Sequence, residues 1–101
     1  MPISYSLTAL RAAQAQGWPI VGAVIDRWRD RRRPGLRELA PRYLFCDVDG
    51  LPRFGKLKFE GAQLAIFEVQ SAATARRLSA RGAELIETFH FGELKHELEH
   101  K

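Results

Sequence analysis

The residues best suited to bind a ligand are arginines, and seven of them lie close together in the chain. They fall within residues 26–42: Arg27, Arg29, Arg31, Arg32, Arg33, Arg37 and Arg42. A guanidinium presents a planar fork of N–H donors that matches phosphate oxygens, and several such contacts release counterions from a polyanion. The cluster therefore predicts a surface for DNA or RNA phosphates. The alternative is a solvated helix end, where arginines favour the helix dipole and pair with Asp26, Asp30 and Glu38.

The positive charge of the whole chain is concentrated in this segment. The formal net charge is +4 over 101 residues. Residues 1–25 contribute +1, residues 26–42 contribute +4 and residues 43–101 contribute −1. Because the remainder is close to neutral, the sequence predicts one cationic patch rather than a uniformly basic surface.

A second basic stretch is RFGKLKF, at residues 53–59. It resembles the strand with which RNA-recognition domains stack bases. The matching positions are Phe54, Gly55, Leu57 and Phe59. On a strand, Phe54, Lys56 and Lys58 would share one face, so these three join the arginines as candidate binding residues. The alternative is an exposed strand edge with two solvated lysines.

The last residues contain a possible metal site. The stretch HELEH, at residues 96–100, resembles the helix of zinc-dependent proteases, in which two histidines bind zinc and a glutamate activates water. The resemblance implies a zinc hydrolase. The available ligands are Glu93, His96 and His100. Leu94 and Leu98 define the buried face of the expected helix, however, so both histidines would point to water. We therefore expect a solvated helix face, with no metal, no cofactor and no catalytic residue.

A possible catalytic pair occurs in Asp47-Val48-Asp49-Gly50. This tetrapeptide looks like the strand-end D-x-D-G of haloacid-dehalogenase-type phosphatases, which implies a nucleophilic Asp47 and an acidic Asp49 on a parallel sheet. Leu51 and Pro52 stand where that family has threonine and the start of a helix. Since Asp-Gly is also a strong two-residue turn signal, we interpret the stretch as a hairpin turn.

The first 40 residues are expected to be helical. Ser6 is a suitable N-cap for a helix that runs to about Gln16. A second helix is expected from Pro19 to Pro34-Gly35, because four apolar residues follow helical spacing. These residues are Val21, Val24, Ile25 and Trp28. One further helical turn is expected over residues 36–40.

Residues 43–69 predict a three-stranded antiparallel meander. The strands are expected at residues 43–48, 53–59 and 62–69, with turns at Asp49-Gly50 and Glu60-Gly61. Cys46 lies on the first strand and is expected to be a buried apolar residue rather than a reactive thiol.

Residues 71–101 predict a helix followed by a less regular tail. Ser71 is a suitable N-cap, and Gly82 stands where a helix commonly ends. Residues 84–91 could prolong the helix or form a fourth strand. We favour the strand, because a glycine inside a helix costs about 1 kcal/mol. A short helix is expected after Gly92, and no internal repeat is apparent.

Length and composition predict one soluble domain. The chain is 46% hydrophobic and 28% charged, and its single cysteine cannot form an internal disulfide. No stretch has the length of a membrane span, and the first residues lack the pattern of a secretory signal. We therefore expect a cytoplasmic protein.

The sequence thus predicts a single α+β domain that is a non-enzymatic binding or regulatory module, with nucleic acid as its partner. The main alternative is a protein-interaction or homodimerisation module, in which the arginines meet an acidic partner. Residues 84–101 carry five acidic and two basic residues, so a head-to-tail dimer could use both ends of the chain. The third hypothesis is the zinc hydrolase.

Overall fold

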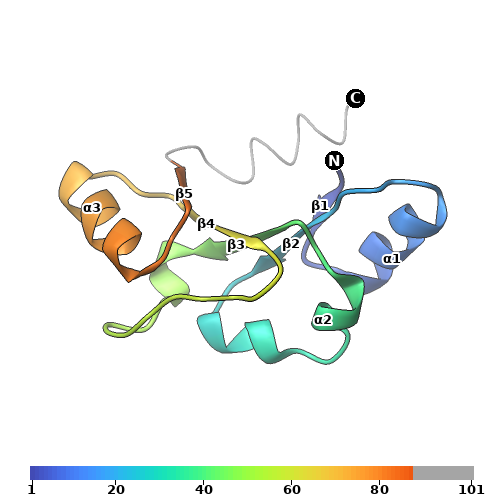
Figure 1. The fold of residues 1–101 in the computed structure, drawn as a ribbon, viewed down its shortest axis with the longest axis horizontal. Helices are drawn as coiled ribbons and strands as arrows, with labels where there is room; N and C mark the ends of the chain where they lie inside the picture. The colour runs from blue at the N-terminus through green and yellow to red at the C-terminus, as the bar shows by residue number, and fades with distance from the viewer. Residues whose placement is uncertain (88–101) are drawn as a thin grey trace.

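The computed structural model describes residues 1–87. A five-stranded sheet forms its centre, with strands in the order β1-β2-β3-β4-β5 and every neighbouring pair parallel. The strands are β1 (Ile3–Ser4), β2 (Gly22–Ile25), β3 (Tyr43–Asp47), β4 (Gln63–Phe67) and β5 (Leu85–Glu87). The connections contain the helices α1 (Leu7–Ala15), α2 (Leu36–Leu39) and α3 (Ala72–Arg81), and the 3₁₀ helices η1 (Trp28–Arg32) and η2 (Val48–Gly50). Figure 1 shows the three α-helices spread along the sheet.

The strands recur at a nearly constant interval along the chain. In the sheet register Ile3 pairs with Gly22, Gly22 with Tyr43, Tyr43 with Gln63, and Ala65 with Leu85. Each strand is therefore followed about 20 residues later by its neighbour, an interval typical of structural repeats. Each interval contains one strand and one connection. The connection returns the chain to the end of the sheet at which the strands begin, as parallel pairing requires.

Both faces of the sheet are apolar. On one face, alternate strand residues join a buried cluster with residues of α1, η1, α2 and α3. The strand members are Ala23, Ile25, Leu44, Cys46, Leu64 and Ile66, and the helical members are Leu10, Trp28, Leu36, Leu39 and Leu78. The other face carries a second buried cluster, made of Val24, Phe45, Ala65 and Phe67. Burial on both faces is typical of parallel sheets and explains why these strands are almost continuously apolar.

The capped helices were predicted correctly. The Ser6 hydroxyl accepts a hydrogen bond from the Ala9 N–H at 3.1 Å and so begins α1. The Ser71 hydroxyl accepts one from the Thr74 N–H at 3.1 Å and begins α3. Gly82 ends α3 with a φ of 121°, a conformation that favours glycine. The short turn expected at residues 36–40 is also present, as α2.

The second predicted helix is wrong, and residues 1–40 are therefore not purely helical. Gly22–Ile25 form β2, in which all four residues are buried, and Trp28 begins η1. Val21, Val24 and Ile25 match helical spacing only because nearly every residue of this short run is apolar. A buried strand and a buried helix cannot be distinguished by periodicity over so few positions.

The antiparallel meander is also wrong. Two of its strands exist as β3 and β4, but they are parallel neighbours. Asp49-Gly50 lies in η2 rather than in a hairpin turn. A side chain on Gly50 would overlap the carbonyl oxygen of Asp26, so close backbone packing explains this glycine. Residues 53–59 form no strand and belong to the connection that carries the chain back before β4.

The remaining predictions are partly covered by the described residues. β5 falls within the predicted strand 84–91, whereas residues 88–91 and the helix expected after Gly92 lie outside the description. Cys46 is fully buried, as expected. Within residues 1–87, no helix has the length and hydropathy needed to cross a membrane. The mixed helix-and-strand class is confirmed, and residues 1–87 form one small domain.

Candidate functional site

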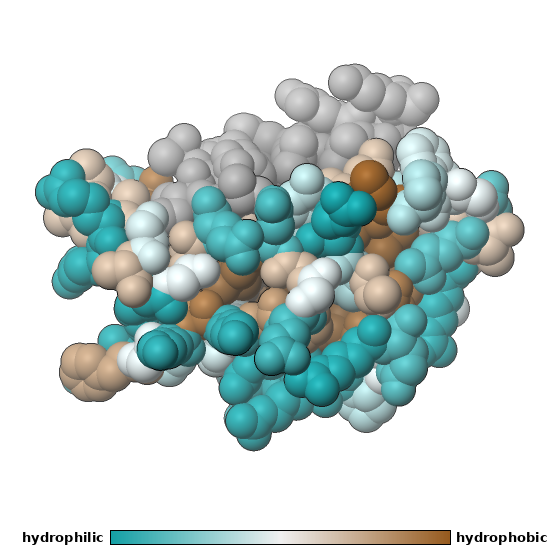
Figure 2. All heavy atoms as spheres, in the orientation of Figure 1, coloured by the Kyte–Doolittle hydropathy of each residue, from teal (hydrophilic) through white to brown (hydrophobic). Residues whose placement is uncertain are grey.

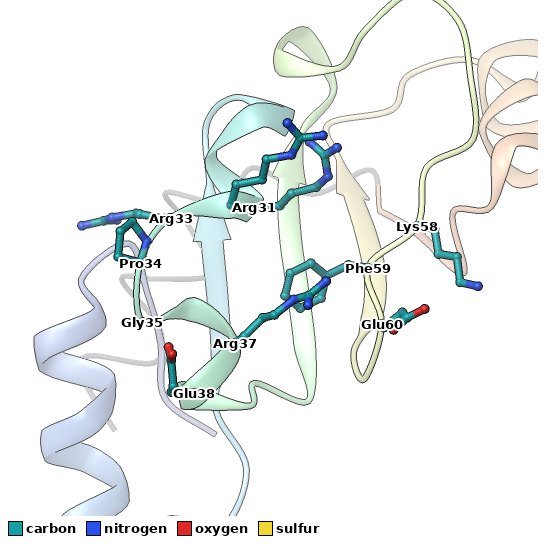
Figure 3. Close-up of a pocket in the computed structure, with 10 residues that line it drawn as sticks. Arg31, Arg33, Pro34, Gly35, Arg37, Glu38, Lys58, Phe59 and Glu60 are labelled. Carbon is teal, nitrogen blue, oxygen red and sulfur yellow. The ribbon is translucent and has the colours of Figure 1, made fainter.

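An open hollow of about 590 Å³ lies between two connections of the sheet and is lined by cations. We call it the arginine groove. Arg31, Arg32, Arg33 and Arg37 come from the connection between β2 and β3, and Lys58 comes from the connection between β3 and β4. The lining is completed by Pro34, Gly35, Glu38, Phe59 and Glu60. In Figure 3, Arg37 of α2 and Phe59 point toward each other, while Lys58 points away from Arg37.

The local fold of residues 26–39 explains how four arginines reach one hollow. The Asp30 carboxylate accepts a hydrogen bond from the Arg27 N–H at 3.2 Å, which stabilises the start of η1. The Arg33 N–H donates to the Asp30 carbonyl at 3.0 Å and closes that 3₁₀ helix. Gly35 then adopts a φ of 87° and turns the chain into α2, where Leu36 is buried. Two short helices joined by a tight turn therefore place these arginines along the wall of the same hollow. In Figure 3, Arg33 points away from Arg37 and Phe59.

Two of the groove arginines are held by contacts within the protein. The Arg31 guanidinium lies 4.8 Å from the centre of the Trp28 ring and donates to the Trp28 carbonyl at 3.0 Å. Partial burial lowers the pKa of Arg31, and the positive charge of Arg32 lowers it further. Arg33 donates to the Tyr5 carbonyl at 3.1 Å. These partners are carbonyl oxygens and a ring, so within residues 1–87 these contacts leave the positive charge of both guanidinium groups without a carboxylate partner.

The other three groove cations are available to a ligand. Arg32, Arg37 and Lys58 are exposed, and no side-chain hydrogen bond engages them within residues 1–87. Figure 2 shows that hydrophilic residues cover the lower side of the molecule, over η1 and α2. The groove thus combines two anchored cations with three that can turn toward a bound anion.

The structure brings together half of the predicted binding residues. Arg31, Arg32, Arg33, Arg37 and Lys58 line the groove. The others, Arg27, Arg29, Arg42, Phe54 and Lys56, are exposed but do not line it. Lys58 was chosen because it would share a strand face with Phe54, and that reason is wrong because no strand forms there. Phe59 was missed as a lining residue, since the predicted strand placed it on the opposite face.

Asp47 and Asp49, which resemble a phosphatase pair in sequence, have a structural role. The Asp47 carboxylate accepts a hydrogen bond from the Asp49 N–H at 2.9 Å and caps η2. Nearby, the Tyr5 hydroxyl donates a hydrogen bond to Asp26. Burial raises the pKa of Tyr5 to about 12, with a further contribution from the Asp26 charge.

The described residues contain no group of three or more His, Cys, Asp or Glu side chains arranged to hold a metal ion. The candidate ligands Glu93, His96 and His100 lie outside the described residues, as does the rest of HELEH.

Comparison with known proteins adds no family to this picture: no family model, no curated protein and no solved structure matches the chain.

Proposed function

We propose that the protein is a non-enzymatic module that binds nucleic acid through the arginine groove. The observation that carries the proposal is that five cations, contributed by two successive connections of the sheet, line one open hollow. Glu38 and Glu60 are the acidic residues of the lining, so positive charge is in excess there. Arginine forks match phosphate geometry, and an open hollow accepts a continuous backbone.

Phosphate contacts of this kind give affinity without sequence preference. The groove offers guanidinium and ammonium donors and one aromatic wall, Phe59, which is half-buried. We therefore expect weak discrimination among base sequences and strong dependence on salt. An acidic protein segment would use the same cations, and the experiment below distinguishes the two partners.

The test is fluorescence anisotropy of a labelled 20-nucleotide single strand and of a labelled duplex, at several salt concentrations. If all five groove cations contact phosphates, the logarithm of the association constant should fall against the logarithm of the salt concentration with a slope of about −3.5 for a single strand. The groove variant changes Arg32, Arg37 and Lys58 to alanine. These positions are chosen because they are exposed and make no side-chain hydrogen bond within residues 1–87.

A control variant removes the same amount of charge elsewhere. It changes Arg42, Arg76 and Arg77 to alanine, three exposed residues that do not line the groove. We expect the groove variant to lose at least tenfold in affinity and to flatten the salt slope by about 2, with a smaller loss for the control. Equal losses in the two variants, or binding that salt does not weaken, would contradict the proposal. Selective binding of an acidic peptide without nucleic-acid binding would favour the protein partner.

A further inference from the structure

The connection between η2 and β4 carries a loop that a single arginine holds at both ends. Arg81, at the end of α3, donates from Nη2 to the Pro52 carbonyl at 2.7 Å and from Nε to the Gly55 carbonyl at 2.8 Å. The Leu57 N–H returns a hydrogen bond to the Arg81 carbonyl at 2.7 Å, and Leu57 itself is buried. The loop at residues 52–55 is therefore fixed to α3 although it projects from the sheet (Figure 1).

What this fixed loop presents is an aromatic ring. Phe54 lies between the two clamped carbonyls and is 83% exposed, well above the 50% of Trp18. Gly55 has a φ of 104° with open space where a side chain would stand, so the loop turns sharply just after the ring. Because hydrogen bonds fix the loop, the exposed ring is already ordered, and a partner that contacts it would pay little conformational entropy.

The residues around the ring are cationic and lie close in sequence to the arginine groove. Arg53 and Lys56 flank Phe54 and are exposed. Lys58, four residues after Phe54, lines the groove. Four residues of fully extended chain span at most about 14 Å, so the ring and the groove are within reach of one polymer.

We propose that Phe54 stacks on a base of a single-stranded nucleic acid whose phosphates lie in the arginine groove, and that Arg81 is the positioning residue of this loop. The inference rests on the proposed function and adds the class of nucleic acid. A single strand exposes base faces, whereas a duplex keeps them stacked on neighbouring pairs. An aromatic ring among cations supplies both interactions that sequence-independent single-strand binding needs.

The test compares a labelled 20-nucleotide oligothymidine with a labelled hairpin duplex by fluorescence anisotropy. Phe54→Ala should weaken oligothymidine binding by about 5- to 150-fold, the range measured for loss of one stacked base, and leave duplex binding unchanged. The salt slope should stay the same, because the phosphate contacts remain. Phe54→Tyr should retain most of the affinity, and Trp18→Ala, which removes another exposed aromatic ring, should have no effect.

Arg81→Ala separates positioning from folding. It should lower the ratio of oligothymidine to duplex affinity while duplex affinity stays constant, a change that general destabilisation would not produce. An unchanged ratio would overturn the role of Arg81.

The outcomes separate this inference from the proposed function. If the groove variant loses affinity and Phe54→Ala does not, the groove binds nucleic acid but the stacking proposal fails. If Phe54→Ala weakens single-strand and duplex binding equally, the ring makes no base-specific contact and the proposal also fails. Absence of any nucleic-acid binding, with Phe54-dependent binding to phosphatidylserine vesicles instead, would overturn both.

Discussion

Neighbouring arginines of the groove have different roles. Arg31 lies against the Trp28 ring and donates to the Trp28 carbonyl, while Arg32 is exposed. The consecutive arginines at residues 31–33 cannot be assigned different roles from the sequence, because the roles depend on which guanidinium lies against the buried Trp28 ring. The distinction matters for experiment, since replacing all three arginines would change folding and binding together.

Arg31→Ala should lower the free energy of unfolding by about 1–2 kcal/mol, from the lost contact with the ring and the lost hydrogen bond. Arg32→Ala should change it by less than about 0.5 kcal/mol, as is usual for exposed positions. Urea unfolding followed by circular dichroism measures both values. Equal effects of the two substitutions would show that Arg31 is not anchored as described.

Cys46 gives a prediction for the dependence of stability on pH. Burial raises its pKa to about 12, from an ordinary value of 9.0, and the Asp47 charge raises it further. Between pH 9 and 12 the unfolded thiol loses its proton while the folded thiol keeps it. The folded state then binds more protons, so stability is fully present below pH 9 and falls as the pH rises toward 12.

Cys46→Ala should make this decline less steep, and Tyr5, whose pKa is also raised to about 12, accounts for part of what remains. Urea unfolding of the wild type and the variant at pH 8 and pH 10.5 tests the point. The same loss of stability in both proteins would exclude a contribution from the Cys46 thiol.

At the scale of elements, β2 and the Asp-Gly turn show where sequence reasoning fails. A short run of apolar residues satisfies helical spacing and strand burial equally, so the spacing predicts a helix where the structure has β2. Asp49-Gly50 resembles a hairpin turn, but its glycine is needed because η2 packs on the backbone at Asp26. A local sequence pattern cannot predict the contact between Gly50 and Asp26, because Asp26 lies in a different connection of the sheet.

Gly50→Ala should therefore lower the free energy of unfolding by about 1–3 kcal/mol, since the added carbon overlaps the Asp26 carbonyl and the backbone must move. Gly61→Ala is the matched control: its φ of 87° favours glycine, but nothing lies within 4 Å of the added carbon. It should cost about 1 kcal/mol, because a residue with a side chain is strained in the left-handed conformation. A larger loss for Gly61→Ala than for Gly50→Ala in urea unfolding would contradict the packing of η2.

For the whole molecule, the sequence predicts the mixed helix-and-strand class, the capped starts of two helices and the clustering of positive charge, but not the topology of the sheet. The repeat of about 20 residues is invisible as sequence identity because equivalent positions share burial rather than residue type. Ile25, Cys46 and Ile66 occupy one row of the sheet, and Ala23, Leu44 and Leu64 another. Parallel pairing depends on contacts distant in sequence, which no local pattern contains.

The same reason limits what could be predicted of the site. The arginines of one connection were visible as a charge cluster, because they are consecutive in the chain. Lys58 and Phe59 line the same hollow only because the connection before β4 returns beside the one that follows β2. Half of the predicted binding residues therefore line the groove, and the other half are exposed at other places on the surface.

The central claim is that cations gathered by the parallel fold bind nucleic acid as one surface. Its most direct test is the salt dependence of oligonucleotide binding in the wild type, the groove variant and the charge-matched control. We predict a steep slope for the wild type, a slope flatter by about 2 for the groove variant, and a control close to the wild type. Superimposable slopes for the two variants would show that total charge, and not the arginine groove, determines binding.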